Sequence, residues 1–458
     1  MPSVDLSPPT SLRKRALGAG AWNMVSLVGT QALRLGGNLI MARLLVPDMF
    51  GIMAISTTLS VVLHLLSDVG LRQNIIQSPR GDDPLFLNTA WTVQLLRGIL
   101  LFAVTLLIAF GSWVTQQINL WPAGSSYAAP ELPLVLAVTG ISAVIYGLQS
   151  NTIDLAVRAF QQKRVVILEL TAQFVGLLVM LVFGYLTRSI WSLVAAGIVS
   201  TLVSTVMSHL LFEGPRSRLC WDKSALTELI NYGRWILLSS MVGVLAMNGD
   251  RIWFGGVMST FDMGVYSIAV LILSAVQVGL LKLGGAVVLP AFSEATRAGD
   301  KPRLLKLYNH FRLYFDTACL FACGLFLTVS PLIISWLYDD RYQDAGRILA
   351  ILSWSFFTLR YSLAHQVWLA VGLTKYQAMD NIIRAVSLWV GMPLMLALGG
   401  VDYAIWWVAL HTFPTLILVF YVNRKLEIFS LKRELIVLPI IAVGALCGEL
   451  VTRLFNGF

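Results

Sequence analysis

The chain has 458 residues, of which 57% are hydrophobic and only 12% are charged. A soluble protein of this length needs more polar surface, so the composition excludes an ordinary globular domain and predicts a membrane protein. The net charge is +9, but the basic residues are distributed as membrane topology requires, so they do not indicate a nucleic-acid partner.

Apolar runs of about 20 residues recur along the chain, the length that a helix needs to cross a hydrocarbon layer of ~30 Å. Before the first run, Arg13-Lys14-Arg15 precede a full-length span rather than the short apolar core of a cleavable signal peptide. We predict thirteen membrane-spanning helices, at residues 20–46, 49–71, 85–112, 132–153, 165–186, 189–212, 229–257, 262–290, 308–336, 346–370, 376–399, 403–423 and 435–452.

The distribution of charge predicts how these helices are oriented. If Arg13-Lys14-Arg15 lie in the cytoplasm, the alternate loops that hold most of the other Lys and Arg residues lie there too. The longest loop on the opposite side, 113–131, has no Lys or Arg at all. The sequence therefore predicts a multi-pass protein with a cytoplasmic N-terminus.

The first span carries polar residues near its centre. Gln31, Arg34 and Asn38 are spaced i, i+3 and i+7, which places them on one helical face. An ionisable residue at mid-membrane costs about 2.5–3.5 kcal/mol on insertion scales, so it normally faces a protein interior or a wet cavity. We therefore expect one wet side on this helix.

The chain shows a weak internal repeat. A shift of 213 positions superposes Gly20, Trp22, Ser26, Gly36, Gly51 and Ile55 on Gly233, Trp235, Ser239, Gly249, Gly264 and Ile268. The same shift aligns Asn38 with Arg251, one turn after Asn248. Both first spans run in the same direction, so we expect a parallel repeat of two six-helix lobes with a substrate site between them. Two unrelated six-helix bundles are the alternative.

These observations predict the domain organisation of the chain. We expect an N-terminal cytoplasmic segment (1–19), an N-lobe of helices 1–6 (20–212), a cytoplasmic linker (213–228), a C-lobe of helices 7–12 (229–425), and a C-terminal loop with an extra helix (426–458).

The other charged residues within the predicted spans differ in whether a partner of opposite charge lies nearby in the sequence. Arg312 with Asp316, and Arg384 with Asp380, are i, i+4 pairs that can neutralise each other. Arg97 has no local carboxylate in the sequence, and the carboxylate nearest to Arg251, Asp250, is its chain neighbour on a different face. Further cations lie at Arg360, at Lys282 and, near span ends where they can snorkel, at Arg43 and Arg234.

Central carboxylates are scarce in the first six spans, so a cavity lined by Arg34, Arg97 and Arg251 suits an anionic ligand, above all a phosphate. No catalytic motif accompanies these cations. The five histidines are scattered without ligand spacing, and Cys319 and Cys323 lie one turn apart in a span without a histidine cluster. We expect neither an enzyme nor a metal site.

Four segments resemble the Wzx-type polysaccharide flippases, the polysaccharide transport branch of the multidrug/oligosaccharidyl-lipid/polysaccharide exporter superfamily. The segments are GAWNMVSLVGTQALRLGGNLIMARLLVPDMFGIMAIS (20–56), LLSDVGLRQNIIQ (65–77), GDRIWFGGVMSTFDMGVYSIA (249–269) and LPAFSEA (289–295). The positions that match the charged residues of the family pattern are Arg34, Arg43, Asp68, Asp250 and Arg251.

The resemblance implies an all-α polytopic membrane protein of about 12–14 helices, with two lobes around a V-shaped cavity, in the bacterial cytoplasmic membrane. It implies a flippase that carries undecaprenyl-diphosphate-linked oligosaccharide to the outer leaflet for surface polysaccharide synthesis, together with a polymerase and export machinery. No cofactor is implied. An ion gradient is a candidate driving force, and Asp250 and Asp68 are candidates for ion coupling or gating. A structural Asp–Arg contact is the other interpretation of Asp250.

We expect Arg34, Arg97, Arg251, Arg43, Gln31, Asn38 and Asn248 to bind the diphosphate or glycan. An ion-coupled drug exporter of the same fold is one alternative, although it predicts mid-span carboxylates where this chain has arginines. A membrane glycosyltransferase or polymerase of the same pathway is the other, and it needs a large acid-bearing loop.

Overall fold

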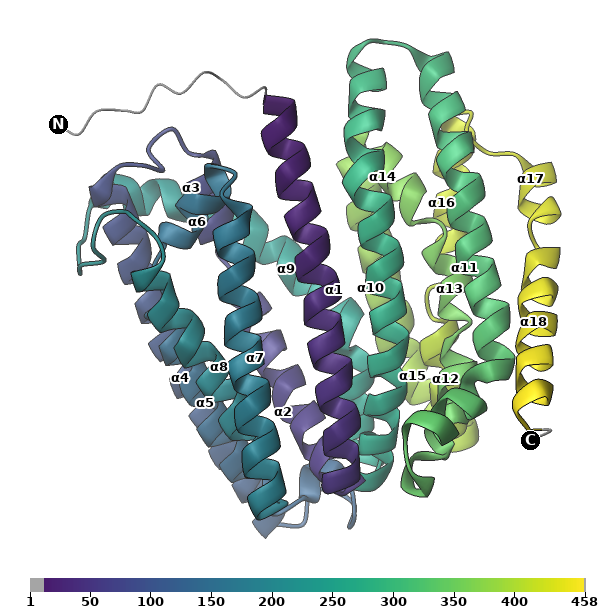
Figure 1. The fold of residues 1–458 in the computed structure, drawn as a ribbon, viewed down its shortest axis with the longest axis horizontal. Coiled ribbons are helices and arrows are strands. Elements are labelled where there is room, and N and C mark those ends of the chain that lie inside the picture. The colour runs from purple at the N-terminus through teal and green to yellow at the C-terminus, as the bar shows by residue number, and fades with distance from the viewer. Residues whose placement is uncertain (1–11, 457–458) are drawn as a thin grey trace. The chain divides into compact units, whose positions relative to one another are not determined.

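The computed structural model describes residues 12–456, and most of them are helical (Figure 1). The helices are α1 (Leu12–Leu44), α2 (Pro47–Leu66), α3 (Leu71–Gln77), α4 (Pro84–Gln117), η1 (Ser126–Ala128), α5 (Leu132–Gly147), α6 (Thr152–Arg158), α7 (Gln162–Thr187), α8 (Trp191–Leu210), α9 (Lys223–Val257), α10 (Thr260–Arg297), α11 (Lys301–Leu337), η2 (Asp340–Tyr342), α12 (Asp344–Leu352), α13 (Ser355–Leu359), α14 (Ser362–Ala370), α15 (Thr374–Leu410), α16 (Thr415–Lys425), α17 (Leu431–Ile436) and α18 (Pro439–Asn456). Within 12–456, extended pairing is limited to an isolated bridge between Ser125 and Ser259. The predicted all-α class is confirmed.

Every predicted span coincides with a helix or a row of helices. By length and hydropathy, eight helical segments among residues 12–456 can cross a membrane, and a ninth can if α5 and α6, bent by 61°, form one broken span. One of the eight, Thr374–Lys425, has 52 residues, which is long enough for two spans. Residues 1–11 of the predicted N-terminal segment lie outside the described residues, and α1 starts earlier than the predicted span, at Leu12.

The long helices α1 and α9 are not among the eight apolar segments. Each carries polar side chains in its interior, with Arg34 in α1 and the pair Asp250 and Arg251 in α9. The first span, for which a wet face is predicted, and the helix that carries Arg251 are therefore long enough to span a membrane but more polar than the eight segments.

Two predicted spans are irregular. The prediction of one helix over 346–370 is wrong, because α12, α13 and α14 occupy that stretch as three short helices. No Gly or Pro lies between 347 and 371 to mark the breaks. A second interruption falls between two predicted spans inside α15, where Gly399 and Gly400 leave helical geometry and Gly400 has a φ of 68°.

The chain folds into two compact units. Unit 1 comprises residues up to 37, 67–107 and 136–237, and unit 2 comprises 38–66, 108–135 and 238–458. The boundaries run through α1, α4, α5 and α9. The predicted linker 213–228 lies wholly in unit 1.

Hydrogen bonds from backbone amides of the linker to side chains of α4 attach the linker within unit 1. The amide of Cys220 donates to Thr92 Oγ1 at 3.0 Å, and the amide of Asp222 donates to Thr89 Oγ1 at 3.2 Å. Buried apolar residues of α3, α4 and α9 form a shared core beneath this contact, which comprises Leu71, Ile75, Phe86, Leu87, Ala90, Ala225 and Leu229. The linker is thus packed against α4 and hydrogen-bonded to it.

In unit 2, α2 and α10 cross at their first turns. A Cβ atom on Gly51 would lie 2.0 Å from the carbonyl oxygen of Thr260, and a Cβ on Gly264 would lie 2.0 Å from that of Pro47. Pro47 and Thr260, like Gly51 and Gly264, are separated by the 213 positions of the sequence repeat. The two aligned turns therefore meet reciprocally, and this pair of helix starts obeys the predicted repeat.

The end of the chain packs into the same unit. α18 lies alongside α11 (Figure 1). The predicted extra C-terminal helix is therefore present, and the segment Leu431–Phe455 is among the eight that can span a membrane.

Candidate functional site

The α9 residues of the predicted site lie in unit 2. Asp250 is 9% exposed and accepts a hydrogen bond from the hydroxyl of Tyr266 on α10. Arg251, which is half-buried, reaches the other way and donates from Nη1 to Thr58 Oγ1 of α2 at 3.5 Å. Asn248 turns back on its own helix and donates to the carbonyl of Val244 at 3.4 Å.

These contacts separate the two charged neighbours. No ion pair within 4.0 Å joins Asp250 to Arg251 in the part of the chain that the structure describes, so the direct Asp–Arg contact considered above is not formed. The carboxylate of Asp250 is held by a tyrosine instead. Among the described residues, the guanidinium of Arg251 makes a long contact, 3.5 Å, to the neutral hydroxyl of Thr58, and a guanidinium has five N–H donors in all.

Arg97 and Asp68 lie together in unit 1. Arg97 Nε donates to Ser67 Oγ at 2.9 Å, and Asp68 is within electrostatic range of the guanidinium. Asp68 Oδ1 accepts the amide of Gly70 at 2.9 Å, and Gly70 has a φ of 62°. Asp68 is therefore the acidic neighbour of Arg97, which the local sequence does not reveal. Asp68 also stabilises the turn before α3 through its hydrogen bond with Gly70.

On α1, Gln31, Arg34 and Asn38 keep the predicted helical spacing and are all half-buried. Gln31 and Arg34 belong to unit 1, and Asn38 belongs to unit 2. The structure thus places two of the three proposed phosphate-binding arginines, Arg34 and Arg97, in unit 1 and the third in unit 2.

Arg43 is exposed in the last turn of α1, beside a separate charged group. Arg341 donates to the carbonyls of Ala42 and Leu45 at 2.9 and 3.0 Å and so caps this helix end. Its hydrogen bonds to Asp339 hold the pKa of that carboxyl below its usual value, and Arg43 adds to the effect. Arg43 therefore belongs to the charge balance of a helix end rather than to the mid-span set.

Sequence reasoning missed a buried ion network in unit 2. The predicted Arg312–Asp316 pair is confirmed at 3.1 Å. Arg360 joins it, 3.7 Å from Asp316, and Glu434 of α17 binds both arginines, lying 2.8 Å from Arg360. All four residues are at most 6% exposed. Glu434 is distant in sequence from Arg312 and Arg360, so no local sequence pattern predicts this ion network.

A second missed group surrounds the predicted Asp380–Arg384 pair, which is also confirmed, with Arg384 Nε 2.7 Å from Asp380 Oδ2. His365 of α14 lies on the other side, with Nε2 3.6 Å from Asp380 Oδ1. The sequence offers no sign of this histidine, because 15 positions separate it from Asp380.

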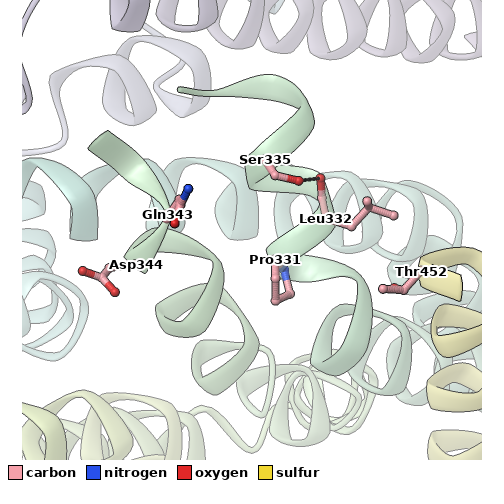
Figure 2. A pocket seen from close by; sticks show the side chains of 6 residues that line it. All are labelled: Pro331, Leu332, Ser335, Gln343, Asp344 and Thr452. Atoms are coloured by element: carbon pink, nitrogen blue, oxygen red, sulfur yellow. Dashed lines mark hydrogen bonds between the residues drawn. The ribbon is translucent and has the colours of Figure 1, made fainter. Parts of the chain in front are cut away.

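One small cavity is formed between α11, α12 and α18 in unit 2, with a volume of about 400 Å³. Its lining residues are Pro331, Leu332, Ser335, Gln343, Asp344 and Thr452 (Figure 2). The hydroxyl of Ser335 donates to the carbonyl of Leu332 and that of Thr452 to the carbonyl of Gly448, so both are occupied within their own helices. The cavity contains none of the predicted site residues. Among residues 12–456, no group of three His, Cys, Asp or Glu side chains is arranged to hold a metal ion.

Comparison with known proteins gives consistent results. The family of polysaccharide biosynthesis proteins matches residues 40–345. The succinoglycan biosynthesis transport protein ExoT of Rhizobium meliloti is 20% identical over 349 residues, covering 76% of this chain and 67% of the relative. The lipopolysaccharide biosynthesis protein WzxC of Escherichia coli is also 20% identical, covering 75% and 67%.

The fold has solved counterparts. The lipid II flippase MurJ in an inward closed conformation superposes with a TM-score of 0.67 over 94% of this chain and 98% of its own, at 13% sequence identity. At that identity the likeness shows a shared fold and nothing finer.

Proposed function

The chain belongs to the family of polysaccharide biosynthesis proteins, and from that premise we propose that it is a flippase for undecaprenyl-diphosphate-linked oligosaccharide. It is a multi-pass membrane transporter of the Wzx type and not an enzyme. In this proposal two six-helix lobes alternately open a central site to each side of the bacterial cytoplasmic membrane. The lipid-linked repeat unit moves from the cytoplasmic to the outer leaflet, where a polymerase and export machinery receive it.

The observation that carries the proposal is the arginine content of the two polar long helices. Arg34 in α1 and Arg251 in α9 are half-buried in helices long enough to span a membrane. An ionisable side chain within a membrane-spanning helix normally faces the protein interior or a water-filled cavity. A guanidinium binds phosphate oxygens through two parallel hydrogen bonds, so these residues suit a diphosphate better than a cationic drug.

The other residues take supporting roles in the proposal. Arg97, which donates to Ser67, adds a further cation, and Gln31, Asn38 and Asn248 supply neutral donors for the glycan. Asp250 is the candidate for coupling to an ion gradient, with its tyrosine contact as the element that responds. We place the N-terminus in the cytoplasm, as the charged loops favour.

The test uses cells that lack this gene, complemented with Arg34→Ala, Arg251→Ala or Arg34→Lys at matched membrane levels. Surface polysaccharide and retained undecaprenyl-diphosphate-linked units are both measured. We expect both alanine variants to lose surface polymer and accumulate the lipid-linked units, with partial rescue by lysine, because lysine keeps the charge and loses the bidentate geometry.

Arg216→Ala is the matched control, since Arg216 is an exposed arginine of the linker. Normal export by both mid-span alanine variants would assign the two arginines to structure and defeat the proposed cationic site. Loss of export without accumulation of lipid-linked units would instead defeat the proposed substrate.

A further inference from the structure

The loop that joins α4 to α5, residues 118–131, packs on the end of α9 and the start of α10 within unit 2. Ser125 forms an isolated antiparallel bridge with Ser259, which precedes α10. The amide and the hydroxyl of Ser126 both donate to the carbonyl of Met258, at 2.8 and 3.0 Å. Met258 follows the last residue of α9, where carbonyls have no partner within the helix. The loop thus supplies the hydrogen bonds that this helix end needs.

Tyr127 makes a second contact, further back along α9. Its hydroxyl donates to the carbonyl of Ile252 at 2.7 Å. Its ring lies against the helix backbone, because a Cβ atom on Gly255 would be 2.6 Å from Tyr127 Cε1. Trp121 covers the next glycine, and its Cζ3 would lie 3.3 Å from a Cβ on Gly256. The two aromatic rings therefore occupy the space that side chains on α9 would otherwise fill.

The tyrosine contact lies beside the proposed diphosphate-binding residue of α9. Ile252, which accepts the bond from Tyr127, directly follows Arg251 in the chain. Consecutive residues of a helix share one rigid backbone, so a loop that holds Ile252 also holds the backbone of Arg251. A movement of the loop and a movement of this part of α9 are therefore mechanically linked.

The loop keeps its shape through contacts of its own. Gln116 Nε2, at the end of α4, donates to the carbonyls of Tyr127 and Ala129 at 3.1 and 2.8 Å. The ring of Trp121 packs edge-on against that of Tyr127, with 4.9 Å between the centroids. These contacts stay within the loop and α4, whereas the contacts described before them join the loop to α9 and α10. The tip of the loop can therefore leave α9 as one piece.

Two features lower the free energy that holds the loop on α9. Hydrogen bonds to backbone carbonyls contribute little net free energy, because water can replace the donor. Ser125 is 5% exposed, and among the described residues its Oγ has no hydrogen-bond partner. A hydroxyl buried in this way regains partners when it returns to water. The contact is therefore suited to opening and closing.

The helices that flank the loop connect it to the other unit. Residues 108–135 belong to unit 2, but α4 and α5 both continue into unit 1. In the proposed transport cycle the lobes move, so α4 and α5 pull on the loop while α9 holds its tip. Either the contact with α9 opens in each cycle, or the loop and α9 move together. The first alternative is favoured, because the tip keeps its shape without α9 and meets it through exchangeable polar contacts.

We propose that residues 118–131 form a latch on the outer side of the transporter, which is closed on α9 and α10 in this structure and is released when the proposed site opens outward. Tyr127 is the positioning residue of the latch, because it contacts α9 beside Arg251. The inference rests on the proposed function, since a latch that opens and closes requires alternating access.

The first experiment locks the latch. Opposed residues of an antiparallel bridge have Cα atoms about 4.5–5.5 Å apart, a separation that a disulfide can span. Ser125→Cys combined with Ser259→Cys is expressed in cells that lack this gene and is oxidised with copper phenanthroline, and the loss of two free thiols confirms the bond. We expect oxidation to stop the appearance of new surface polysaccharide, and dithiothreitol to restore it.

The matched controls are the two single variants, Ser125→Cys and Ser259→Cys, which meet the same oxidant but cannot form this bond. Both should export normally under oxidation, which also excludes an effect of the four native cysteines. The reduced double variant shows that the substitutions themselves leave the protein folded and active. Undiminished export by the fully cross-linked double variant would overturn the proposal.

The second experiment detects opening without a transport assay. Full-length Ser125→Cys in intact cells is exposed to a maleimide that does not cross the cytoplasmic membrane. Ala123→Cys, at an exposed position of the same loop, gives the labelling rate of an unprotected thiol. We expect Ser125→Cys to label more slowly than Ala123→Cys but to completion. Tyr127→Phe, which removes the bond to Ile252, should speed this labelling about fivefold, the factor expected for one hydrogen bond.

Three results of this experiment would contradict the latch. They are a Ser125→Cys variant that never labels, a labelling rate that Tyr127→Phe leaves unchanged, and an Ala123→Cys variant that is not labelled, because the last result would place the loop on the cytoplasmic side.

The two experiments separate the latch from the proposed substrate. If oxidation stops surface polymer but undecaprenyl-diphosphate-linked units do not accumulate inside the cell, the latch stands and the proposed substrate falls. If Arg34→Ala and Arg251→Ala accumulate those units while the cross-linked variant exports normally, the proposed function stands and the latch falls.

Discussion

At the level of single residues, intramembrane charge in this protein is of two kinds. Arg312 and Arg360 are buried against carboxylates, and each is at most 6% exposed. Arg34, Arg97 and Arg251 are half-buried. Arg97 donates to the hydroxyl of Ser67 and lies within electrostatic range of Asp68, and Arg251 donates to the hydroxyl of Thr58. The first kind is neutralised in a buried ion network, whereas the second lies partly accessible on its helices.

Asp68 provides a test at this scale. Its Oδ1 accepts the Gly70 amide in the turn before α3, and an asparagine can accept the same bond. We expect Asp68→Asn to keep the wild-type thermal stability, and Asp68→Ala to lower the free energy of unfolding by about 1 kcal/mol, the usual net contribution of one hydrogen bond. Thermal unfolding of the purified variants measures this. If Asp68→Asn is as unstable as Asp68→Ala, the charge beside Arg97 matters more than the turn.

At the level of elements, hydropathy located the helices because lipid contact demands continuous apolar stretches. It did not locate the breaks. The three short helices α12, α13 and α14 follow one another without Gly or Pro, and Arg360 between α13 and α14 is drawn into the buried ion network. Such a break depends on tertiary partners such as Glu434, which no local window contains.

The crossing of α2 and α10 gives a prediction for elements. Gly51→Ala or Gly264→Ala would place a methyl group 2.0 Å from a backbone oxygen, so the helices must separate. We expect each variant to lose about 1–3 kcal/mol or more, as overpacked sites do. Unfolding in detergent and the yield of monodisperse protein measure the loss.

Gly197→Ala on α8 is the matched control. A Cβ at Gly197 meets nothing within 4 Å, so this variant should be as stable as the wild type or more stable. If Gly51→Ala and Gly197→Ala were equally stable, α2 and α10 would have to be farther apart at Gly51 than the structure shows.

At the level of the whole molecule, the sequence predicted the class of the protein and the first arginine of its proposed site. The repeat and the polar face of the first span led to Arg34 and Arg251. The group around Asp380 was only half found. The i, i+4 spacing reveals Arg384, but His365 reaches the same carboxylate from another helix. Local periodicity carries no information about such a contact.

The C-terminal segment gives the prediction for the molecule as a whole. Glu434 binds Arg312 and Arg360 and so ties α17 to the body of unit 2. Glu434→Gln should lower the free energy of unfolding by about 3–5 kcal/mol, because it leaves a buried cation without its counter-charge. Chemical or thermal unfolding in detergent measures this, and Glu449→Gln, at an exposed pair with Arg453, should change stability little.

A double variant sharpens that test. Arg360→Met with Glu434→Leu removes one charge of each sign and leaves the Arg312–Asp316 pair in place. It should be more stable than Glu434→Gln alone, since replacing a whole buried pair by apolar groups is often neutral. The opposite order would show that Glu434 acts by shape rather than by charge.

The reciprocal contact of Gly51 and Gly264 is an isologous interface, the kind that joins the two copies of a C2 homodimer. In a homodimer every substitution appears twice, so the two sides of the interface remain identical. Here both sides belong to one polypeptide, and each position changes alone. This freedom is visible at Asn38 and Arg251, which the same 213-residue offset aligns: one half has a neutral amide where the other has a cation. Joining the halves in one polypeptide allows helix starts that pack symmetrically to be followed by different side chains in each half.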